Sequence, residues 1–346
     1  MSQPPSTKTP RSGLLAGGNF IIDHIKMIDA YPAENMLANI SGESSANGGG
    51  PYNVLKNLAK LGATFPLEAV GLIGDDEDGR KILADCDAHH IDTSQIHQTE
   101  LAHTSYTDAM TVTETGRRTF FHQPGANALL DVSHFNFSRS NARLFHLAYL
   151  MLLRTLDTLD SDNATAAAHL LANAQQLGFI TTCDIVSTNA PDLLPVARAA
   201  LPYIDHLIIN EIEAGAIIDH DLRPAGSISL DAAKTAAQSL LHLGVSTRVV
   251  IHFEEGAVAA NSKGDIVTQP SLNLPPDFIQ GATGAGDAFA TGYLYGVHED
   301  LPLNECLRYA VCVAAQCLTD PTTSNGIQPL PTCLALSESH GFRSLP

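Results

Sequence analysis

The second half of the chain alternates between short apolar runs and longer segments with the period of amphipathic helices. The apolar runs have the length of buried strands and lie at residues 144–152, 179–183, 206–209, 249–252 and 257–260. Helix-like segments separate them, at residues 164–177, at 193–201 and after Ser229. This alternation predicts an α/β fold, in which helices cover both faces of a mostly parallel sheet.

The carboxyl ends of such strands are where open α/β sheets bind ligands. Four polar residues each follow an apolar run and are therefore expected at this edge, namely Asp23, Asp184, Asn210 and Asp287. Because several of them carry a carboxylate, the edge is a candidate for chemistry and not only for folding.

The front of the chain has a different pattern. Residues 14–16 and 65–73 read as buried strands, and the helix expected between them starts near Pro51 and stops at Gly62. Residues 104–121 read as two strands joined by a hairpin turn. The acidic stretch that follows Gly74 is interpreted as a solvated turn into a helix from Arg80, with a metal-binding loop as the alternative.

The domain organisation is inferred from the segments that lack a strand or helix pattern. Residues 1–13 are rich in proline, serine and threonine, lack the apolar core of a secretory signal, and are expected to form a disordered arm. Residues 14–346 contain no long linker and no internal repeat, so we expect a single domain. No apolar run reaches about 18 residues, so no membrane span is expected.

The segment from Gly281 to Ala290 contains the strongest candidate chemistry. A glycine-rich turn feeds a helix there, so the backbone N–H groups of Gly284, Ala285 and Gly286 are predicted to form an anion site. Asp287 would lie beside that anion, where it could take a proton from an attacking hydroxyl. The alternative is an ordinary tight turn in which Asp287 caps the helix. The glycine spacing fits neither a P-loop nor a dinucleotide fingerprint.

Two further groups of candidate residues lie near the start of the chain. Gly48, Gly49 and Gly50 precede the helix that holds Asn53 in its first turn. Asn19 and Asp23 are polar residues in an apolar strand context, where they need partners. Both could reach a polyhydroxyl ligand; alternatively, Asn19 bonds its own turn and Asp23 faces solvent.

Composition narrows the class of partner. The net charge of −18 and pI of about 5.1 argue against nucleic acid and anionic membranes as partners, although ATP can still bind through local N–H groups and Mg²⁺. The six cysteines include no Cys-x-x-Cys pair and are expected to be reduced. A cytoplasmic enzyme is the resulting expectation.

Taken in order along the chain, these motifs resemble the ribokinase-like (PfkB) family of carbohydrate and nucleoside kinases. The resemblance covers about residues 14–332, and its most specific parts are Gly-Gly-x-x-x-Asn ending at Asn53 and Gly-Ala-Gly-Asp ending at Asp287. It implies a three-layer α/β/α core with a small β-sheet lid, built here from about residues 24–45 and 101–122. It also implies ATP-dependent phosphorylation of an alcohol group.

The resemblance assigns roles residue by residue. Asp287 matches the catalytic base, and Gly284, Ala285 and Gly286 match the anion hole. The positions that hold the hydroxyls of the acceptor match Asn19, Asp23, Gly48, Gly49 and Asn53. The nucleotide side matches Asn210, Glu213, Thr283 and Gly256, with Glu213 expected to organise Mg²⁺ through water. ATP and Mg²⁺ are the implied cofactors.

Three departures from the family pattern fall on the nucleotide side. Gly281 stands where the family has an aspartate that often serves a monovalent cation, so potassium activation is doubtful. Phe253 stands near a family glycine and is followed by Glu254 and Glu255, and Val311 stands where an asparagine often lies beside adenine. These changes keep a second function open, a sugar- or nucleoside-binding protein without transfer activity.

The acceptor itself is left open between sugars and nucleosides. No lysine accompanies Gly50-Pro51, which argues against a phosphorylated sugar, whereas Arg117 or Arg118 could serve an acidic one. A dinucleotide-dependent dehydrogenase is disfavoured because Gly-x-Gly-x-x-Gly is absent. An exposed lid sheet would favour pairing of two subunits as a homodimer.

Overall fold

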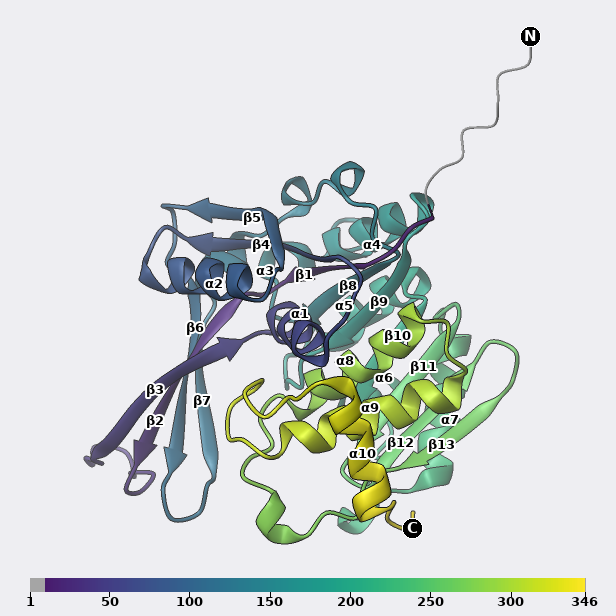
Figure 1. The fold of residues 1–346 in the computed structure, drawn as a ribbon. Coiled ribbons are helices and arrows are strands. Elements are labelled where there is room, and N and C mark those ends of the chain that lie inside the picture. The colour runs from purple at the N-terminus through teal and green to yellow at the C-terminus, as the bar shows by residue number, and fades with distance from the viewer. Residues whose placement is uncertain (1–9, 346) are drawn as a thin grey trace.

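The computed structural model describes residues 10–345 and contains two sheets (Figure 1). The large sheet has nine strands in the order β13 (Ile266–Pro270), β12 (Gly256–Asn261), β11 (Arg248–Phe253), β10 (His206–Asn210), β9 (Ile180–Ile185), β8 (Leu144–Leu150), β1 (Leu14–Gly18), β4 (Leu67–Gly74) and β5 (Asp92–Thr99). Its strands pair in parallel except that β12 runs antiparallel to β11 and β13.

Helices cover both faces of the large sheet. The helices are α1 (Gly50–Leu61), α2 (Glu77–Ala88), α3 (Arg154–Asp157), α4 (Ala166–Gln176), α5 (Leu193–Ala200), α6 (Glu211–Ile218), α7 (Leu230–His242), α8 (Ala285–His298), α9 (Leu303–Cys317) and α10 (Leu330–His340). Leu14 and Ala16 of β1 pack into one core with α1, α8 and α9, whereas Leu15 packs into a second core with α4, α5 and α7. The predicted three-layer α/β/α arrangement is confirmed.

The small sheet has the order β3 (Ile40–Gly48), β2 (Ile21–Ile28), β6 (Ser105–Val112) and β7 (Arg118–Gln123). It extends to one side of the core (Figure 1), and β2 follows β1 after only Asn19 and Phe20. The acceptor-side residues predicted from the sequence therefore flank the point where the chain passes from one sheet to the other.

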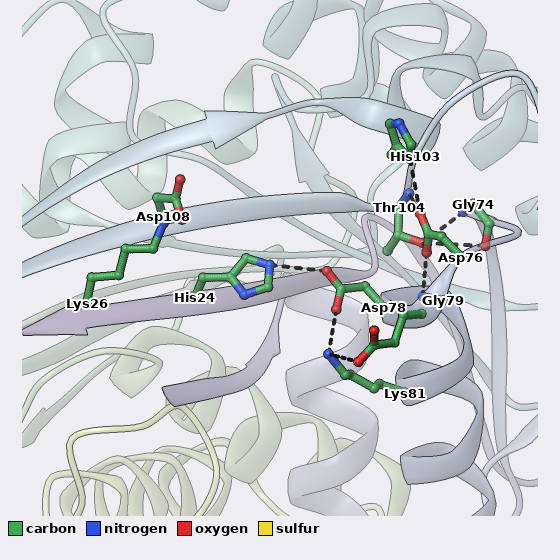
Figure 2. A network of polar contacts seen from close by, with 11 residues as sticks. His24, Lys26, Gly74, Asp76, Asp78, Gly79, Lys81, His103, Thr104 and Asp108 are labelled. Carbon is green, nitrogen blue, oxygen red and sulfur yellow. Dashed lines mark hydrogen bonds and ion pairs between the residues drawn. The ribbon is translucent and has the colours of Figure 1, made fainter. Parts of the chain in front are cut away.

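The acidic stretch after β4 is a turn that ties the small sheet to the core (Figure 2). Asp76 caps α2 by accepting from the N–H of Gly79 at 2.8 Å, and it also accepts from the N–H and Oγ1 of Thr104, each at 2.7 Å. Asp78 pairs with His24 of β2 at 3.1 Å. The helix starts at Glu77, three residues earlier than the sequence pattern suggests, because Asp76 provides the cap.

The N-terminal end of the described chain is tied to the core. Residues 1–9 of the expected arm lie outside the described residues, and Arg11 donates to the carbonyls of Ala142 and Leu177. All six cysteines are buried and unpaired. Among residues 10–345, no helix combines the length and apolar character that a membrane crossing requires.

Candidate active site

The glycine-rich turn before α8 is the segment for which the sequence predicts an anion site. Gly284 precedes the helix with φ +78°, and a Cβ atom there would lie 2.8 Å from the Cα of Thr323. A side chain would therefore be strained and would also clash, so glycine is required. The N–H group of Ala285 donates to the carbonyl of Ala282 at 3.3 Å. The first-turn N–H groups, including that of Gly286, have no carbonyl partner within the helix.

Asp287 lies in the first turn of α8 and is buried. One carboxylate oxygen accepts from Asn53 Nδ2 at 2.7 Å, and the other accepts from the hydroxyl of Tyr149. Burial raises the pKa of Asp287 to about 6, although both hydrogen bonds favour the charged form. The group is thus ionised at neutral pH and has a pKa near the range useful for proton transfer.

A chain of amides holds Asn53 in place. Asn47 Nδ2 donates to Asn53 Oδ1 at 2.6 Å and to Ser324 Oγ at 2.9 Å, while Thr323 Oγ1 donates to the carbonyl of Asn47 at 2.6 Å. These contacts join the start of α1 to the loop that follows α9. The orientation of Asp287 therefore depends on segments far apart in the sequence.

The glycines before α1 are required by close packing. Gly49 has φ +86°, and a Cβ atom there would lie 2.0 Å from the carbonyl oxygen of Asn19. A Cβ atom on Gly48 would lie 2.6 Å from the carboxyl group of Asp23. The sequence motif thus allows Asn19 and Asp23 to approach the backbone of the glycine turn.

Asn19 lies in the interior, whereas Asp23 is half-buried. Asn19 Oδ1 accepts from the N–H of Tyr149 at 2.9 Å, while its Nδ2 is buried without a protein partner. Burial, and then the nearby charge of Asp287, raise the pKa of Asp23 to about 7, whereas Arg118 and Thr107 act in the opposite direction. These two side chains are suited to bind hydroxyl groups.

Asn210 and Glu213 form a capping box at the start of α6. Asn210 Oδ1 accepts from the N–H of Glu213 at 2.9 Å, and Glu213 Oε2 accepts from the N–H of Asn210 at 2.8 Å. Ser187 Oγ adds a bond to Glu213 Oε1 at 2.7 Å. Burial raises the pKa of Glu213 to about 7. The carboxyl group is held rigidly at the carboxyl end of β10.

Two pockets meet at the N-terminus of α8. One, of about 510 Å³, is lined by Asp23, Asn53, Asp287 and other residues of both sheets, and we call it the acceptor pocket. The other, of about 550 Å³, lies between α9 and β11 and is called the donor pocket. Both are lined by Asn210, His252 and Gly286, so these residues mark their boundary.

The remaining residues predicted for the nucleotide side divide between the pockets. Gly256 lines the donor pocket, whereas Thr283 lines the acceptor pocket beside Gly284. The structure thus brings the predicted site residues to this edge of the large sheet, but Asn19 is buried and lines neither pocket, and Gly48 lies behind Asp23 as a backbone spacer.

The three departures from the family pattern have distinct environments. Phe253 and Val311 line the donor pocket. Gly281 packs against Pro321, and a Cβ atom there would lie 3.4 Å from Arg118 Nη2. Glu255, which follows Phe253, is paired with Arg223 at 2.8 Å, so its charge is compensated within the protein.

Arg118 and Arg117 differ in what they contact. Arg118 Nη2 donates to the carbonyl of Pro321 at 2.9 Å, which joins β7 to the loop after α9. Its charge also opposes the rise in the pKa of Asp23. Arg117 is exposed in the hairpin turn. Arg118 is therefore the residue of this pair that acts near the acceptor pocket.

Three residues near the boundary of the pockets were not assigned a role from the sequence. Tyr149 lies in an apolar strand, and His252 is the last but one residue of another, so neither gives a polar spacing signal. Asp184 follows an apolar run but matches no motif; burial raises its pKa well above the ordinary value, and its Oδ1 atom has no protein partner. The strand-end position was the one available signal for Asp184.

Known proteins resemble this chain over most of its length. The pfkB family carbohydrate kinase domain matches residues 16–330. An uncharacterized sugar kinase of Archaeoglobus fulgidus is 26% identical over 261 residues, which cover 75% of this chain and 94% of that protein. A ribokinase of Schizosaccharomyces pombe is 23% identical over 277 residues, which cover 79% and 81% of the two chains.

The fold has counterparts among solved structures. The structure of Arabidopsis thaliana ribokinase complexed with ribose and ATP has a TM-score of 0.76 and 20% identity to this chain, and the match covers 94% of this chain and 98% of that one. This likeness establishes the shared fold, and the family match includes the motifs around Asn53 and Asp287. The chain belongs to the pfkB family of carbohydrate kinases and is a sugar or nucleoside kinase.

Proposed function

We propose that this protein transfers the γ-phosphoryl group of ATP to a hydroxyl group of a small sugar or nucleoside. The observation that carries the proposal is the position of Asp287, a buried carboxylate in the first turn of α8, where the acceptor and donor pockets meet. An acceptor hydroxyl held by Asn19, Asp23 and Asn53 would then face both the base and the nucleotide.

The chemical step needs positioning and charge stabilisation more than covalent catalysis. The acceptor oxygen forms a bond to the γ-phosphorus, the bond to the bridging oxygen breaks, and ADP leaves. Asp287 takes the hydroxyl proton late in this step; its oxygens already accept from Asn53 and Tyr149 but have further acceptor capacity. The N–H groups of Gly284, Ala285 and Gly286 stabilise the charge on the transferring group.

Mg²⁺ fits this site as an ion held mainly by phosphate oxygens and water. Among residues 10–345 no group of three or more His, Cys, Asp or Glu residues is arranged to hold a metal ion directly. Two buried carboxyl groups, those of Glu213 and Asp184, lie at the same edge, and Asp184 Oδ1 has no protein partner. Glu213 would hold the ion through water, in keeping with the preference of Mg²⁺ for retained waters. When bound, it would neutralise charge on the phosphate oxygens.

The presence of Asp287, the proposed base, argues against the alternative of a binding protein without transfer activity. Asp287 accepts its hydrogen bond from Asn53, and the glycines of the turn are all present. Glu255 is paired with Arg223, so its charge would be compensated beside a nucleotide. In the relatives, the names ribokinase and sugar kinase also describe phosphotransfer. A neutral polyhydroxyl acceptor suits a pocket lined by Asp23, Asp184 and Asp287, because the ionised Asp287 would repel an anion.

The test is phosphotransfer by the purified full chain with Mg²⁺ and ATP across D-ribose, D-fructose, adenosine and cytidine, with the product followed by ³¹P NMR. We expect a phosphate ester from at least one acceptor and a loss of turnover of about 10²–10⁴-fold in Asp287→Asn. Thermal stabilisation by an acceptor together with no ester from any of them would instead support the binding protein.

We also propose that two subunits pair through the small sheet. The edge strand β7 exposes Phe121 to 51%, and the opposite edge strand β3 exposes Ile40 to 49%. Exposed apolar side chains on unpaired sheet edges favour association with another edge. Analytical ultracentrifugation should give a dimer for the wild type and a monomer for Phe121→Glu; a monomeric wild type would contradict the pairing.

A further inference from the structure

The loop that joins α9 to α10 packs against the turn that precedes α8. We call residues 318–326 the connecting loop. A Cβ atom on Gly281 would lie 2.8 Å from the Cα of Pro321, and one on Gly284 would lie 2.8 Å from the Cα of Thr323. Neither point has space for a methyl group, so an inward shift of the connecting loop would displace the turn that carries the predicted anion site.

The connecting loop also supports the proposed base. Thr323 Oγ1 donates to the carbonyl of Asn47 at 2.6 Å, and Ser324 Oγ accepts from Asn47 Nδ2 at 2.9 Å. The same Asn47 Nδ2 donates to Asn53, which in turn donates to Asp287. The connecting loop is therefore linked to both parts of the proposed phosphotransfer machinery, the glycine turn and the carboxylate.

Two cationic side chains hold the connecting loop in place. Arg118 Nη2, from the first residue of β7, donates to the carbonyl of Pro321 at 2.9 Å, where the loop lies beside the small sheet (Figure 1). Lys60 Nζ, from the last turn of α1, donates to the carbonyls of Ser324 at 2.7 Å and Asn325 at 2.9 Å. Neither side chain lines the acceptor pocket or the donor pocket, so an effect on the reaction has to be transmitted through other residues.

Arg118 has two routes by which it could act. Side chains two and four positions further along β7, Phe120 and His122, line the acceptor pocket, so Arg118 is on the same face of the small sheet. Its charge lowers the pKa of Asp23, which would contact the acceptor. Action through Asp23 changes acceptor binding and therefore KM, whereas action through the connecting loop changes the chemical step and therefore kcat.

We propose that Arg118 is a positioning residue, which fixes the connecting loop against the turn before α8 and so keeps Asn53 and Asp287 in place for phosphotransfer. This inference rests on the proposed phosphotransfer function and concerns a residue outside both pockets. Lys60 holds the same loop from α1 and has the same effect. A displacement of about 1 Å can lower the rate of a reaction by about 10²-fold, so we expect kcat to fall by about 10–100-fold in Arg118→Met.

The first experiment is steady-state phosphotransfer by the full chain with Mg²⁺, ATP and the acceptor that the wild type phosphorylates fastest. We expect Arg118→Met to lower kcat while KM for ATP and for the acceptor stays within about threefold of the wild-type value. Arg117→Met is the matched control, because this exposed neighbour loses the same charge, and its kcat should be unchanged. An unchanged kcat with a raised KM for the acceptor in Arg118→Met would overturn the inference in favour of the route through Asp23.

Lys60→Met gives an independent variant of the same loop. It should show the same fall in kcat at unchanged KM, and it carries the test alone if Arg118→Met does not fold. The double variant then measures whether the two side chains act through one element, since the effects of independent sites multiply to within about twofold. A larger departure from the product of the two single effects supports the inference, and agreement with that product overturns it.

Hydrogen exchange provides a readout that does not depend on phosphotransfer. A hydrogen bond from a charged group stabilises what it holds by about 10–100-fold in equilibrium terms. Amides within residues 281–287 and 318–326 should therefore exchange at least about tenfold faster in Arg118→Met than in the wild type or in Arg117→Met. Unchanged exchange in Arg118→Met overturns the inference, whereas a wild type that transfers no phosphate refutes the proposed function alone.

Discussion

Replacing Asp287 with asparagine should make the protein more stable and nearly inactive. Burial raises the pKa of this carboxyl group from 3.8 to about 6, so between these pH values the folded state keeps a proton that the unfolded chain has released. Ionisation of Asp287 therefore lowers the free energy of unfolding. One pKa unit corresponds to 1.36 kcal/mol, so the cost is ~3 kcal/mol at neutral pH.

The asparagine can keep both contacts of the carboxylate. Its Oδ1 can accept from Asn53 Nδ2, and its Nδ2 can donate to the hydroxyl of Tyr149, which both donates and accepts. We therefore expect Asp287→Asn to raise the free energy of unfolding by ~3 kcal/mol at pH 8. The cost of the charge grows as pH rises from 3.8 to about 6 and is constant above that, so the gain at pH 5 should be about half as large.

The assay is guanidinium unfolding followed by circular dichroism at pH 8 and pH 5, for the wild type and the variant. Asp231→Asn is the matched control, because Asp231 also lies in the first turn of a helix but its side chain is 95% exposed. Its effect should stay within about 0.5 kcal/mol at both pH values. The reasoning fails if Asp287→Asn is no more stable than the wild type at pH 8, or if its gain is equal at both pH values.

Three further substitutions test the surroundings of Asp287. Tyr149→Phe removes a hydrogen bond that favours the charged carboxylate, so the acid limb of the kcat–pH profile should move up by about half to one pH unit; a downward move would contradict this. His252→Phe keeps the ring beside Phe289 but removes its N–H, and should lower kcat/KM for ATP by about 10–100-fold; an unchanged value would exclude contact with the nucleotide. Gly284→Ala should cost about 1–3 kcal/mol in thermal unfolding, because φ is +78° and Thr323 blocks the Cβ position; wild-type stability would show that the turn can rearrange.

The sequence was most informative where backbone geometry restricts the residue type. Gly49 and Gly284 have positive φ and closely packed surroundings, so glycine at these positions is visible as a spacing motif. Asn53 and Asp287 each follow such a glycine turn in the first turn of a helix, which made them candidates. Parallel strands were likewise visible, because burial on both faces makes them continuous apolar runs.

Other parts of the fold and site depend on contacts between distant segments. Tyr149 and His252 carry no local signal, and their roles arise only where strand ends meet α8. The edge strand β5 was not predicted, because its sequence is polar and mostly exposed. The compensation of Glu255 by Arg223 was also not visible, since these residues lie 32 positions apart.

The joint between the two sheets would give the proposed acceptor an effect on how the sheets are held together. Asn19 stands at the end of β1, fixed to the large sheet by the carbonyl of Ala148, whereas Asp23 belongs to β2 of the small sheet. If a sugar bonds both side chains, as proposed, it would restrict the angle between the two sheets. A molecule that bonds only one of the two side chains would leave this angle unrestricted.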